Sequence, residues 1–132
     1  MSLSEEERKA IVQYRVERAK QSFAEAKGVA EMGMWSLLAN RLYYTLYYIS
    51  VALLIKDGHS TKTHSGMMAL IHQYYIKTKV LSVEDGRLIK RMFDLRQESD
   101  YDDFIFIDEN EIKPFIPKVE ELLNKISSII NK

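Results

Sequence analysis

The feature of this sequence that most restricts its fold is an apolar stretch from Trp35 to Ile55, in which 16 of 21 residues are Ala, Val, Ile, Leu, Trp or Tyr. Asn40 and Arg41 interrupt it, so the uninterrupted part, Leu42 to Ile55, has 14 residues, fewer than the roughly 20 that a bilayer requires. Its four tyrosines also need hydrogen-bond partners, which lipid does not supply. We therefore expect no membrane span here, but a helix that ends near Lys56 and lies at the centre of a helical core.

A second helix is predicted before it, because Ser4 and Glu7 have the spacing of a capping box. Spacings of mostly three and four residues predict that this helix continues to about Glu31, and Gly33 then ends it. Its predicted buried face consists of Ile11, Tyr14, Val16, Ala19, Phe23, Ala26 and Ala30.

Two further helices are predicted after the central one, each with a capping residue. Ser60 or Thr63 is placed to cap the first of them, and Ser82 with Asp85 opens the next. The predicted stripe of the first comprises His64, Met67, Met68, Ile71, Tyr74 and Tyr75. The inner face of the next comprises Leu88, Ile89, Met92, Phe93 and Arg96.

The remaining residues predict an acidic loop and a last helix. We expect residues 99–108 to form the loop and the aromatic residues Tyr101, Phe104 and Phe106 to hold it against the bundle. The last helix is expected from about Lys113 to Ile130, after a separate turn at residues 108–112, because prolines fit best in a first turn. About five helices with short connections predict an all-α, antiparallel up-and-down bundle, forming a single domain over residues 1–132.

Composition excludes several classes of protein. The chain has no cysteine and only five glycines and two prolines, which argues against disulfide-framed, Cys-ligated zinc and collagen-like proteins. Lysine and arginine balance aspartate and glutamate, 19 against 19, so any nucleic-acid site must be local. The first twenty residues begin polar and contain no apolar targeting core, and a cytoplasmic location is the default expectation.

Three polar features need explanation. Asn40 and Arg41 are costly in an apolar helix unless they are satisfied. Either they form part of a functional cleft, or Arg41 reaches an edge of the bundle while Asn40 bonds a backbone carbonyl. Arg96 faces the predicted core and either binds a ligand or forms an ion pair with Asp100 that ties the loop to its helix. His64 lies on an apolar stripe, where a packing role competes with catalysis.

Common enzyme motifs are absent from the sequence. It contains no HExxH, no Glu-x-x-His pair, no glycine-rich phosphate loop and no nucleophile elbow. We therefore predict no metal site and no cofactor.

Three short motifs, in this order, carry a resemblance to a known family. They are Asn40-Arg41-Leu42-Tyr43-Tyr44, Lys62-Thr63-His64-Ser65-Gly66 and Leu95-Arg96-Gln97-Glu98-Ser99-Asp100-Tyr101. Together they resemble the HEPN superfamily, and within it the small standalone proteins with N-R-x-Y-Y, T-H-x-G and R-x-x-x-D-Y signatures. The similarity extends from about Arg15 to Lys125.

The resemblance implies a fold, an activity and partners. The family is an all-α bundle, usually dimeric and often encoded beside a minimal nucleotidyltransferase in toxin–antitoxin-like modules. Its active members are metal-independent ribonucleases in which a histidine follows an arginine a few residues later. Arg96 matches that arginine, but Tyr101 stands where the histidine would be, and a phenol with a pKa of about 10 is a poor proton shuttle near neutral pH.

These implications define the candidate residues. Arg96, Tyr101 and His64 are the catalytic candidates, and the candidates for ligand binding are Asn40, Arg41, Tyr44 and Asp100. The leading hypothesis is a dimeric module, associated with RNA or a nucleotide, that acts with a nucleotidyltransferase partner. The alternatives are an active ribonuclease toxin and a purely structural interaction module.

Two further expectations concern aromatic residues. The tyrosines of the central helix, with Trp35 and Tyr74-Tyr75, exceed what a monomer of this size needs to bury, which favours a homodimer. In related pairs the transferase attaches adenylate to a tyrosine near the arginine motif. Tyr101 is a candidate acceptor, although packing of its ring on the bundle is the favoured alternative.

Overall fold

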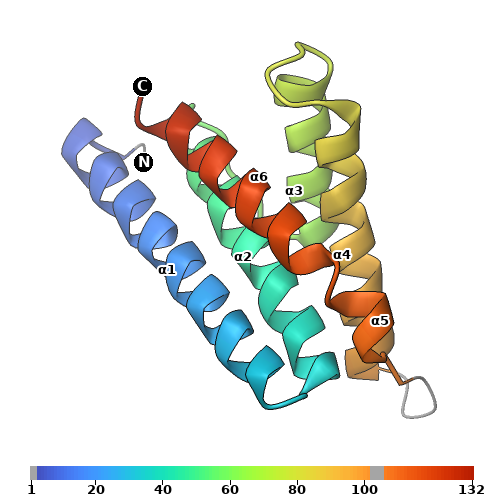
Figure 1. Ribbon diagram of the computed structural model, residues 1–132. Helices are drawn as coiled ribbons and strands as arrows, with labels where there is room; N and C mark the ends of the chain where they lie inside the picture. Colours follow the sequence, from blue (N-terminus) through green and yellow to red (C-terminus); the bar gives the residue numbers. More distant parts are fainter. Residues whose placement is uncertain (1–2, 102–105) are drawn as a thin grey trace.

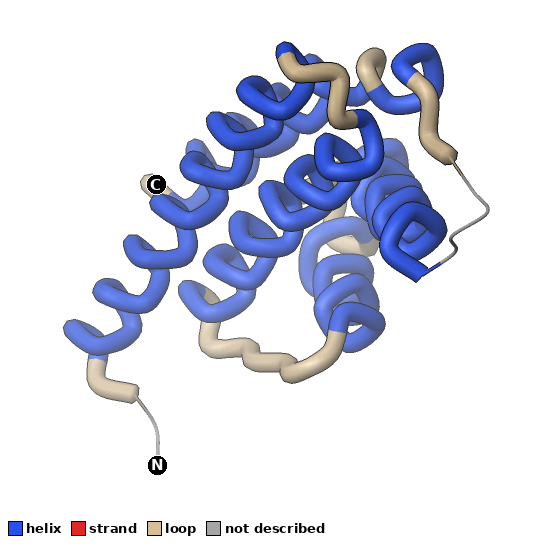
Figure 2. The backbone as a smooth tube through the Cα atoms, turned by 90° about the horizontal axis from the view of Figure 1, so that it is seen from below, coloured by secondary structure: helices blue, strands red, loops and turns tan. Residues whose placement is uncertain are grey.

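The computed structural model describes residues 3–101 and 106–132, and every regular element in these ranges is helical. The elements in chain order are α1 (Glu5–Glu31), α2 (Trp35–Lys56), α3 (His64–Ile71), the π-helical turn η1 (His72–Ile76), α4 (Val83–Tyr101), α5 (Glu109–Ile112) and α6 (Phe115–Ile130). Short connections join them, and the described part of the chain contains no strand (Figure 2). The prediction of an all-α bundle is confirmed.

Helix α2 is the centre of the bundle. It packs antiparallel to α1, and it also contacts α3, α4, α5 and α6 (Figure 1). Most of its apolar residues are buried, including Leu42, Leu46, Ile49 and Leu53, each with no exposed surface. The predicted bounds of this helix are confirmed at both ends.

Local capping explains where the helices begin. Ser4 Oγ accepts a hydrogen bond from the backbone N–H of Glu7 at 3.1 Å, and the Glu7 carboxylate accepts one from the backbone of Ser4 at 3.0 Å. This is the predicted capping box. Of the two proposed caps for α3, Thr63 is the one used. Gly33 follows the end of α1, as predicted, and its φ of +70° is a conformation that favours glycine.

Two aromatic residues predicted to be buried are exposed. Tyr14 of α1 is 61% exposed, because the buried stripe of this helix passes through Val12 and Val16 instead. Tyr74 lies at the edge of the α3 stripe, where its ring stacks on His59 with 3.9 Å between centroids. Its neighbour Tyr75 is buried as predicted.

The first residues of the predicted acidic loop are helical. Helix α4 continues through residues 99–101, since nothing in that segment breaks a helix and Asp100 pairs with Arg96 one turn earlier. Phe106 is 83% exposed, so it does not hold the chain against the bundle, whereas Ile107 is buried there. Phe104 and the Tyr101 side chain lie outside the described residues.

The last part of the chain agrees with the prediction. The separate turn is α5, which Asp108 caps by accepting a hydrogen bond from the backbone of Glu111. Helix α6 then buries one face, and Val119, Leu122 and Ile126 lie on it. Within the described ranges, no helix is both long and apolar enough to cross a membrane.

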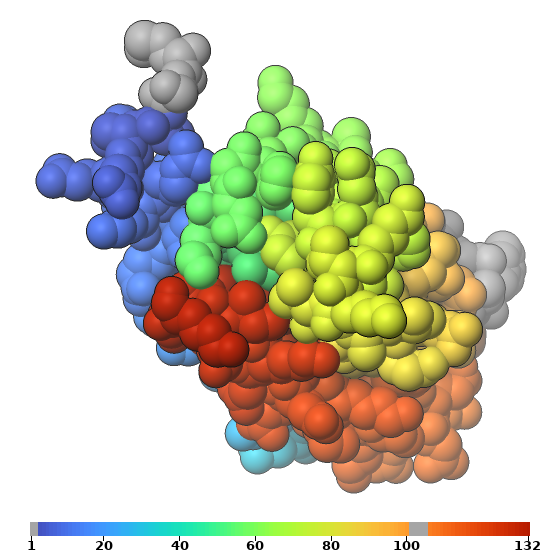
Figure 3. Space-filling model, turned by 90° about the horizontal axis from the view of Figure 1, so that it is seen from above, coloured from blue at the N-terminus to red at the C-terminus, as the bar shows by residue number. Residues whose placement is uncertain are grey.

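Both ends of the chain are tied to the last turn of α2. The Arg8 guanidinium near the start of α1 donates to the backbone carbonyl of Ile55 at 3.2 Å. Lys56 Nζ donates to the carbonyl of Ile129 near the end of α6, also at 3.2 Å. Figure 3 shows this face, where blue α1 and red α6 both border the green end of α2.

Candidate functional site

Five of the predicted site residues lie together where α2 faces α4. They are Asn40, Arg41 and Tyr44 from α2, and Arg96 and Asp100 from α4, and we call this group the arginine corner. The helices bring them together because α2 and α4 pack against each other. Residues 52 or more positions apart in the sequence therefore form one connected group.

Asp100 connects the two helices. One of its carboxylate oxygens, Oδ2, accepts a hydrogen bond from Arg96 Nε at 2.8 Å and another from Asn40 Nδ2 at 3.3 Å. The ion pair expected for Arg96 is thus present, but both partners lie on one helix and it ties no loop to that helix. Its effect is to fix the rotamer of Arg96 and to join α4 to α2.

Arg41 extends the network to α1. Its Nε and Nη2 atoms donate to Asn40 Oδ1 at 3.0 and 2.7 Å, and its Nη1 atom pairs with Glu25 at 3.1 Å. Arg41 therefore reaches an edge of the bundle, as one alternative predicted. The other half of that alternative is wrong, because the Asn40 side chain is bonded to Arg41 and Asp100 and not to a backbone carbonyl.

Both guanidinium groups lie close to the same aromatic ring. The Cζ atom of Arg96 is 5.3 Å from the Tyr44 ring centroid, and that of Arg41 is 5.5 Å from it. Arg96 also lies 5.9 Å from the ring of Tyr43. Cation–π attraction of this kind stabilises the guanidinium groups where water is scarce.

His64 joins the arginine corner through Tyr43. It is the first residue of α3, and its Nδ1 atom lies 2.5 Å from the Tyr43 hydroxyl. Tyr43 contacts Arg96 on its other neighbouring helix, so the fold brings the predicted histidine and arginine to one buried ring. Burial of the imidazole lowers the pKa of His64, and the positive charge of Arg96 lowers it further.

Tyr43 itself was not among the predicted site residues. It has no exposed surface, and burial raises the pKa of its phenol well above the usual range. The sequence carried a usable signal, since a tyrosine in the middle of a buried helix requires a hydrogen-bond partner. What it could not supply was the identity of that partner on another helix.

Tyr101 is the last residue of α4, one position after Asp100. Its side chain is outside the described residues, so its roles as catalyst and as adenylate acceptor stay predictions.

The glycine of the third-helix motif has a structural function. The backbone N–H of Gly66 donates to Thr63 Oγ1 at 2.9 Å, which caps α3. A Cβ atom at position 66 would lie only 2.7 Å from that same oxygen and even closer to the Thr61 hydroxyl. The Thr-His-Ser-Gly sequence therefore builds the helix start that places His64.

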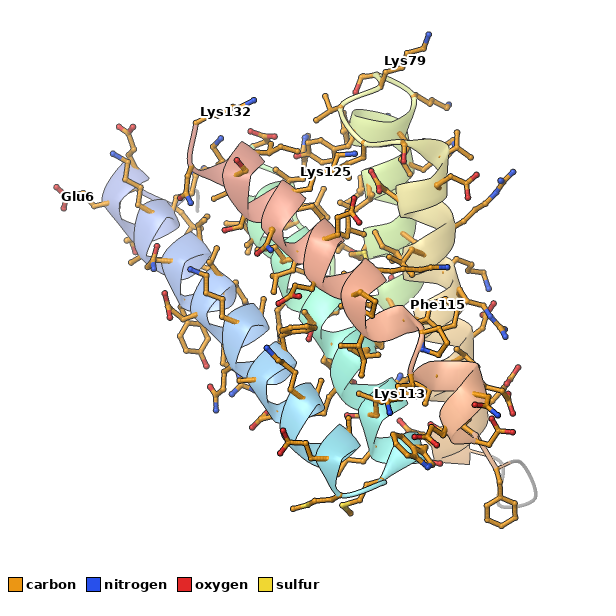
Figure 4. All side chains as sticks on the ribbon, in the orientation of Figure 1. Glu6, Lys79, Lys113, Phe115, Lys125 and Lys132 are labelled. Atoms are coloured by element: carbon orange, nitrogen blue, oxygen red, sulfur yellow. The ribbon has the colours of Figure 1, made fainter. Side chains whose placement is uncertain are left out.

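A separate groove of about 560 Å³ lies between α4 and α6. Phe115 and Lys125 line it (Figure 4). Lys125 Nζ also forms an ion pair with Asp85, another lining residue, at 2.6 Å. None of the predicted site residues whose side chains the structure describes lines this groove. Among residues 3–101 and 106–132, no three His, Asp or Glu side chains are grouped so that they could hold a metal ion.

The fold and the arginine corner define a class of small helical-bundle proteins in which a partly buried arginine of one helix is held against a polar pair on the central helix. The family comparison agrees with this class. The chain belongs to the HEPN domain family, whose model matches residues 12–129, and the predicted resemblance is confirmed.

Curated relatives cover most of the chain. It is 32% identical to a UPF0332 protein of Thermotoga maritima over 94% of both chains. It is 30% identical to a protein of Methanocaldococcus jannaschii named as a candidate toxin, over 83% of this chain and 75% of the relative. A UPF0332 protein of Archaeoglobus fulgidus is 28% identical over 92% of this chain and 96% of its own length.

Proposed function

We propose that this chain is a toxin-like HEPN module that binds the phosphate groups of RNA or of a nucleotide at the arginine corner and has little or no ribonuclease activity of its own. The observation that carries the proposal is that Arg41 and Arg96, from two different helices, lie beside the same half-buried ring of Tyr44. Guanidinium groups held in a fixed geometry are suited to phosphate oxygens.

The surface beside these arginines supports a nucleic-acid ligand. Tyr44, Tyr47 and Tyr48 are partly exposed along one side of α2. Arg18 lies 5.1 Å from the Tyr48 ring and donates to its hydroxyl at 3.2 Å. Aromatic rings interleaved with arginine provide stacking and phosphate contacts, the combination that single-stranded nucleic acids use.

The weak expected catalysis follows from the motif. Metal-free RNA cleavage needs a group that takes and gives protons near neutral pH, and the motif position of that group holds Tyr101. The candidate-toxin name of the Methanocaldococcus jannaschii relative supports a toxin-like role.

Binding is tested with a labelled single-stranded RNA in fluorescence anisotropy. Arg96→Gln removes one positive charge from the arginine corner, and Arg91→Gln removes one from the opposite side of α4, where the arginine is exposed. We expect Arg96→Gln to weaken binding much more than Arg91→Gln at the same salt concentration. Equal losses in the two variants would show that binding does not use the arginine corner.

An active ribonuclease is the second candidate, favoured by one observation: His64 and Arg96 both contact Tyr43. The same RNA is incubated with the wild type and with Arg96→Gln in EDTA, and the products are resolved on a gel. Cleavage that requires Arg96 would establish the ribonuclease and replace the proposal of a binding module.

We also propose that the module is a homodimer. The partly exposed tyrosines of α2 and exposed Tyr14 of α1 give more aromatic surface than a monomer needs. In the proposed dimer the two arginine corners face a shared cleft, so the tyrosines of both copies border the RNA-binding site. Light scattering at micromolar concentration is expected to give twice the chain mass of 15.4 kDa. A mass equal to one chain would rule out this dimer.

The proposed protein partner is a minimal nucleotidyltransferase. It is tested by co-purification with any such enzyme encoded beside the chain. Intact-mass measurement after incubation with that enzyme and ATP then tests Tyr101 as acceptor, because an adduct on the wild type should be absent from Tyr101→Phe. A neighbouring nucleotidyltransferase that neither binds nor modifies the chain would argue against the partnership.

A further inference from the structure

The imidazole ring of His64, at the start of α3, is surrounded by aromatic rings from two other helices. Tyr43, Tyr44 and Tyr47 of α2 face its ring, with centroid distances of 5.4, 6.3 and 4.8 Å. From α4, Phe93 lies 5.9 Å away, and Arg96 is the charged group that acts on the imidazole. Within the described ranges, no carboxylate forms an ion pair or hydrogen bond with His64.

The Tyr43 hydroxyl determines which ring nitrogen carries the proton. Tyr43 has no exposed surface, and the Nδ1 atom of His64 is the partner found for its hydroxyl. A buried hydroxyl whose proton meets no acceptor is costly. The hydroxyl therefore donates to Nδ1, and the neutral imidazole then carries its proton on Nε2.

Three features disfavour protonation of His64. Protonation of the imidazole would add a proton to Nδ1, so the Tyr43 hydroxyl would have to accept a hydrogen bond there. The hydroxyl proton of Tyr43 would then have no partner. Arg96 supplies a like charge nearby. The N-terminal end of α3 carries the positive end of the helix dipole.

We infer that Tyr43 is a positioning residue that locks His64 in the neutral tautomer with the proton on Nε2, so that His64 donates a hydrogen bond to a phosphate oxygen held by Arg96 and does not act as a general base. In that tautomer Nε2 has no lone pair with which to accept the proton of a ribose hydroxyl. This inference rests on the proposed function for its ligand, but the tautomer itself does not depend on any ligand.

The tautomer is tested directly by NMR. Two-bond proton–nitrogen correlation spectra of the ¹⁵N-labelled full chain distinguish the two neutral forms, and the spectrum of His64→Gln assigns the signal. The wild type is expected to have the Nε2–H form above the pKa of His64. An Nδ1–H form in the wild type would overturn the inference without any further variant.

Two phenylalanine variants then separate the hydroxyl from the ring. Tyr43→Phe removes the hydroxyl that meets Nδ1, and we expect a mixture of tautomers and a higher His64 pKa. Tyr47→Phe is the matched control, because its ring is nearer to His64 but no hydrogen bond joins its hydroxyl to the imidazole. If Tyr43→Phe gives the wild-type tautomer and pKa, Tyr43 is not the positioning residue.

The donor role is tested with two amides in the RNA-binding assay. The Gln amide nitrogen of His64→Gln can occupy the place of Nε2, whereas that of His64→Asn corresponds to Nδ1. We expect His64→Gln to bind RNA nearly as the wild type does and His64→Asn to bind about tenfold more weakly, the loss of one hydrogen bond to a charged group.

These outcomes separate the inference from the proposed function. If the wild type binds no RNA, the proposed function fails while the tautomer measurement stands. If RNA binding requires Arg96 but is equal in wild type, His64→Gln and His64→Asn, the function survives and the donor role of His64 fails.

Discussion

Replacing Arg96 with methionine tests how much the arginine corner contributes to stability. The Arg96 side chain is 12% exposed and its partner Asp100 is 29% exposed. Methionine keeps most of the aliphatic stem against the tyrosine rings, so the substitution removes mainly the guanidinium group. Asp100 then retains water and the hydrogen bond from Asn40.

The expected cost lies between two known limits. Removing one partner of a fully buried ion pair costs about 3–5 kcal/mol, whereas an exposed pair contributes about 0–1 kcal/mol. Because Asp100 keeps access to water, we expect Arg96→Met to lower the free energy of unfolding by about 2 kcal/mol.

A double-mutant cycle isolates the pair. The wild type, Arg96→Met, Asp100→Asn and the double variant are unfolded in urea, and their free energies of unfolding are compared. Contacts of Arg96 with Tyr43 and Tyr44 cancel in the cycle, which leaves a coupling of about 1–2 kcal/mol between positions 96 and 100.

Two results would refute this reasoning. A coupling below about 0.5 kcal/mol would place the ion pair among surface pairs of little consequence. If Arg96→Met lowered the free energy of unfolding by more than about 4 kcal/mol, the guanidinium group would behave as part of a fully buried ion pair with a structural role. Combined with unchanged RNA binding, that loss would favour the purely structural interaction module.

Three further predictions concern residues around this site. Gly66→Ala should lower stability by about 1 kcal/mol in thermal denaturation, because a Cβ there crowds the oxygen that caps α3; an unchanged midpoint would contradict this. Since the folded chain lowers the pKa of His64, the unfolded chain binds that proton more tightly, and stability should fall as the pH drops below about 6.5. Urea titrations should show a smaller decrease for His64→Gln than for the wild type, and equal slopes would exclude His64 as the cause. Tyr75→Phe removes a hydroxyl that donates to Asp57 at 2.6 Å and should cost about 1–2 kcal/mol, whereas the exposed control Tyr74→Phe should cost nearly nothing.

The helices were predictable because their signals are local. The capping box at Ser4 and Glu7 and the apolar run after Trp35 place two helices to within a residue. The end of α4 was not predictable in the same way. The many acidic residues suggested a loop, but the bond from Arg96 to Asp100 stabilises one more helical turn.

The candidate site was only partly predictable for a related reason. Sequence order and motif type selected Asn40, Arg96 and Asp100, and the fold brings them together. The hydroxyl of Tyr43 meeting His64 depends on the relative positions of α2 and α3, which no local pattern encodes. Exposure of Tyr14 likewise depends on which side of α1 faces α2, and the spacing rule alone allowed two neighbouring stripes.

The last turn of α2 has a consequence for how the molecule opens. The Ile55 carbonyl accepts a hydrogen bond from Arg8 of α1, and the next residue, Lys56, donates one to the Ile129 carbonyl of α6. Fraying at either terminus therefore breaks a hydrogen bond to the last turn of α2. That turn then holds the other terminus less firmly. The two ends of the chain should behave as one cooperative unit in native-state hydrogen exchange, with α1 and α6 amides near that turn sharing a single opening free energy.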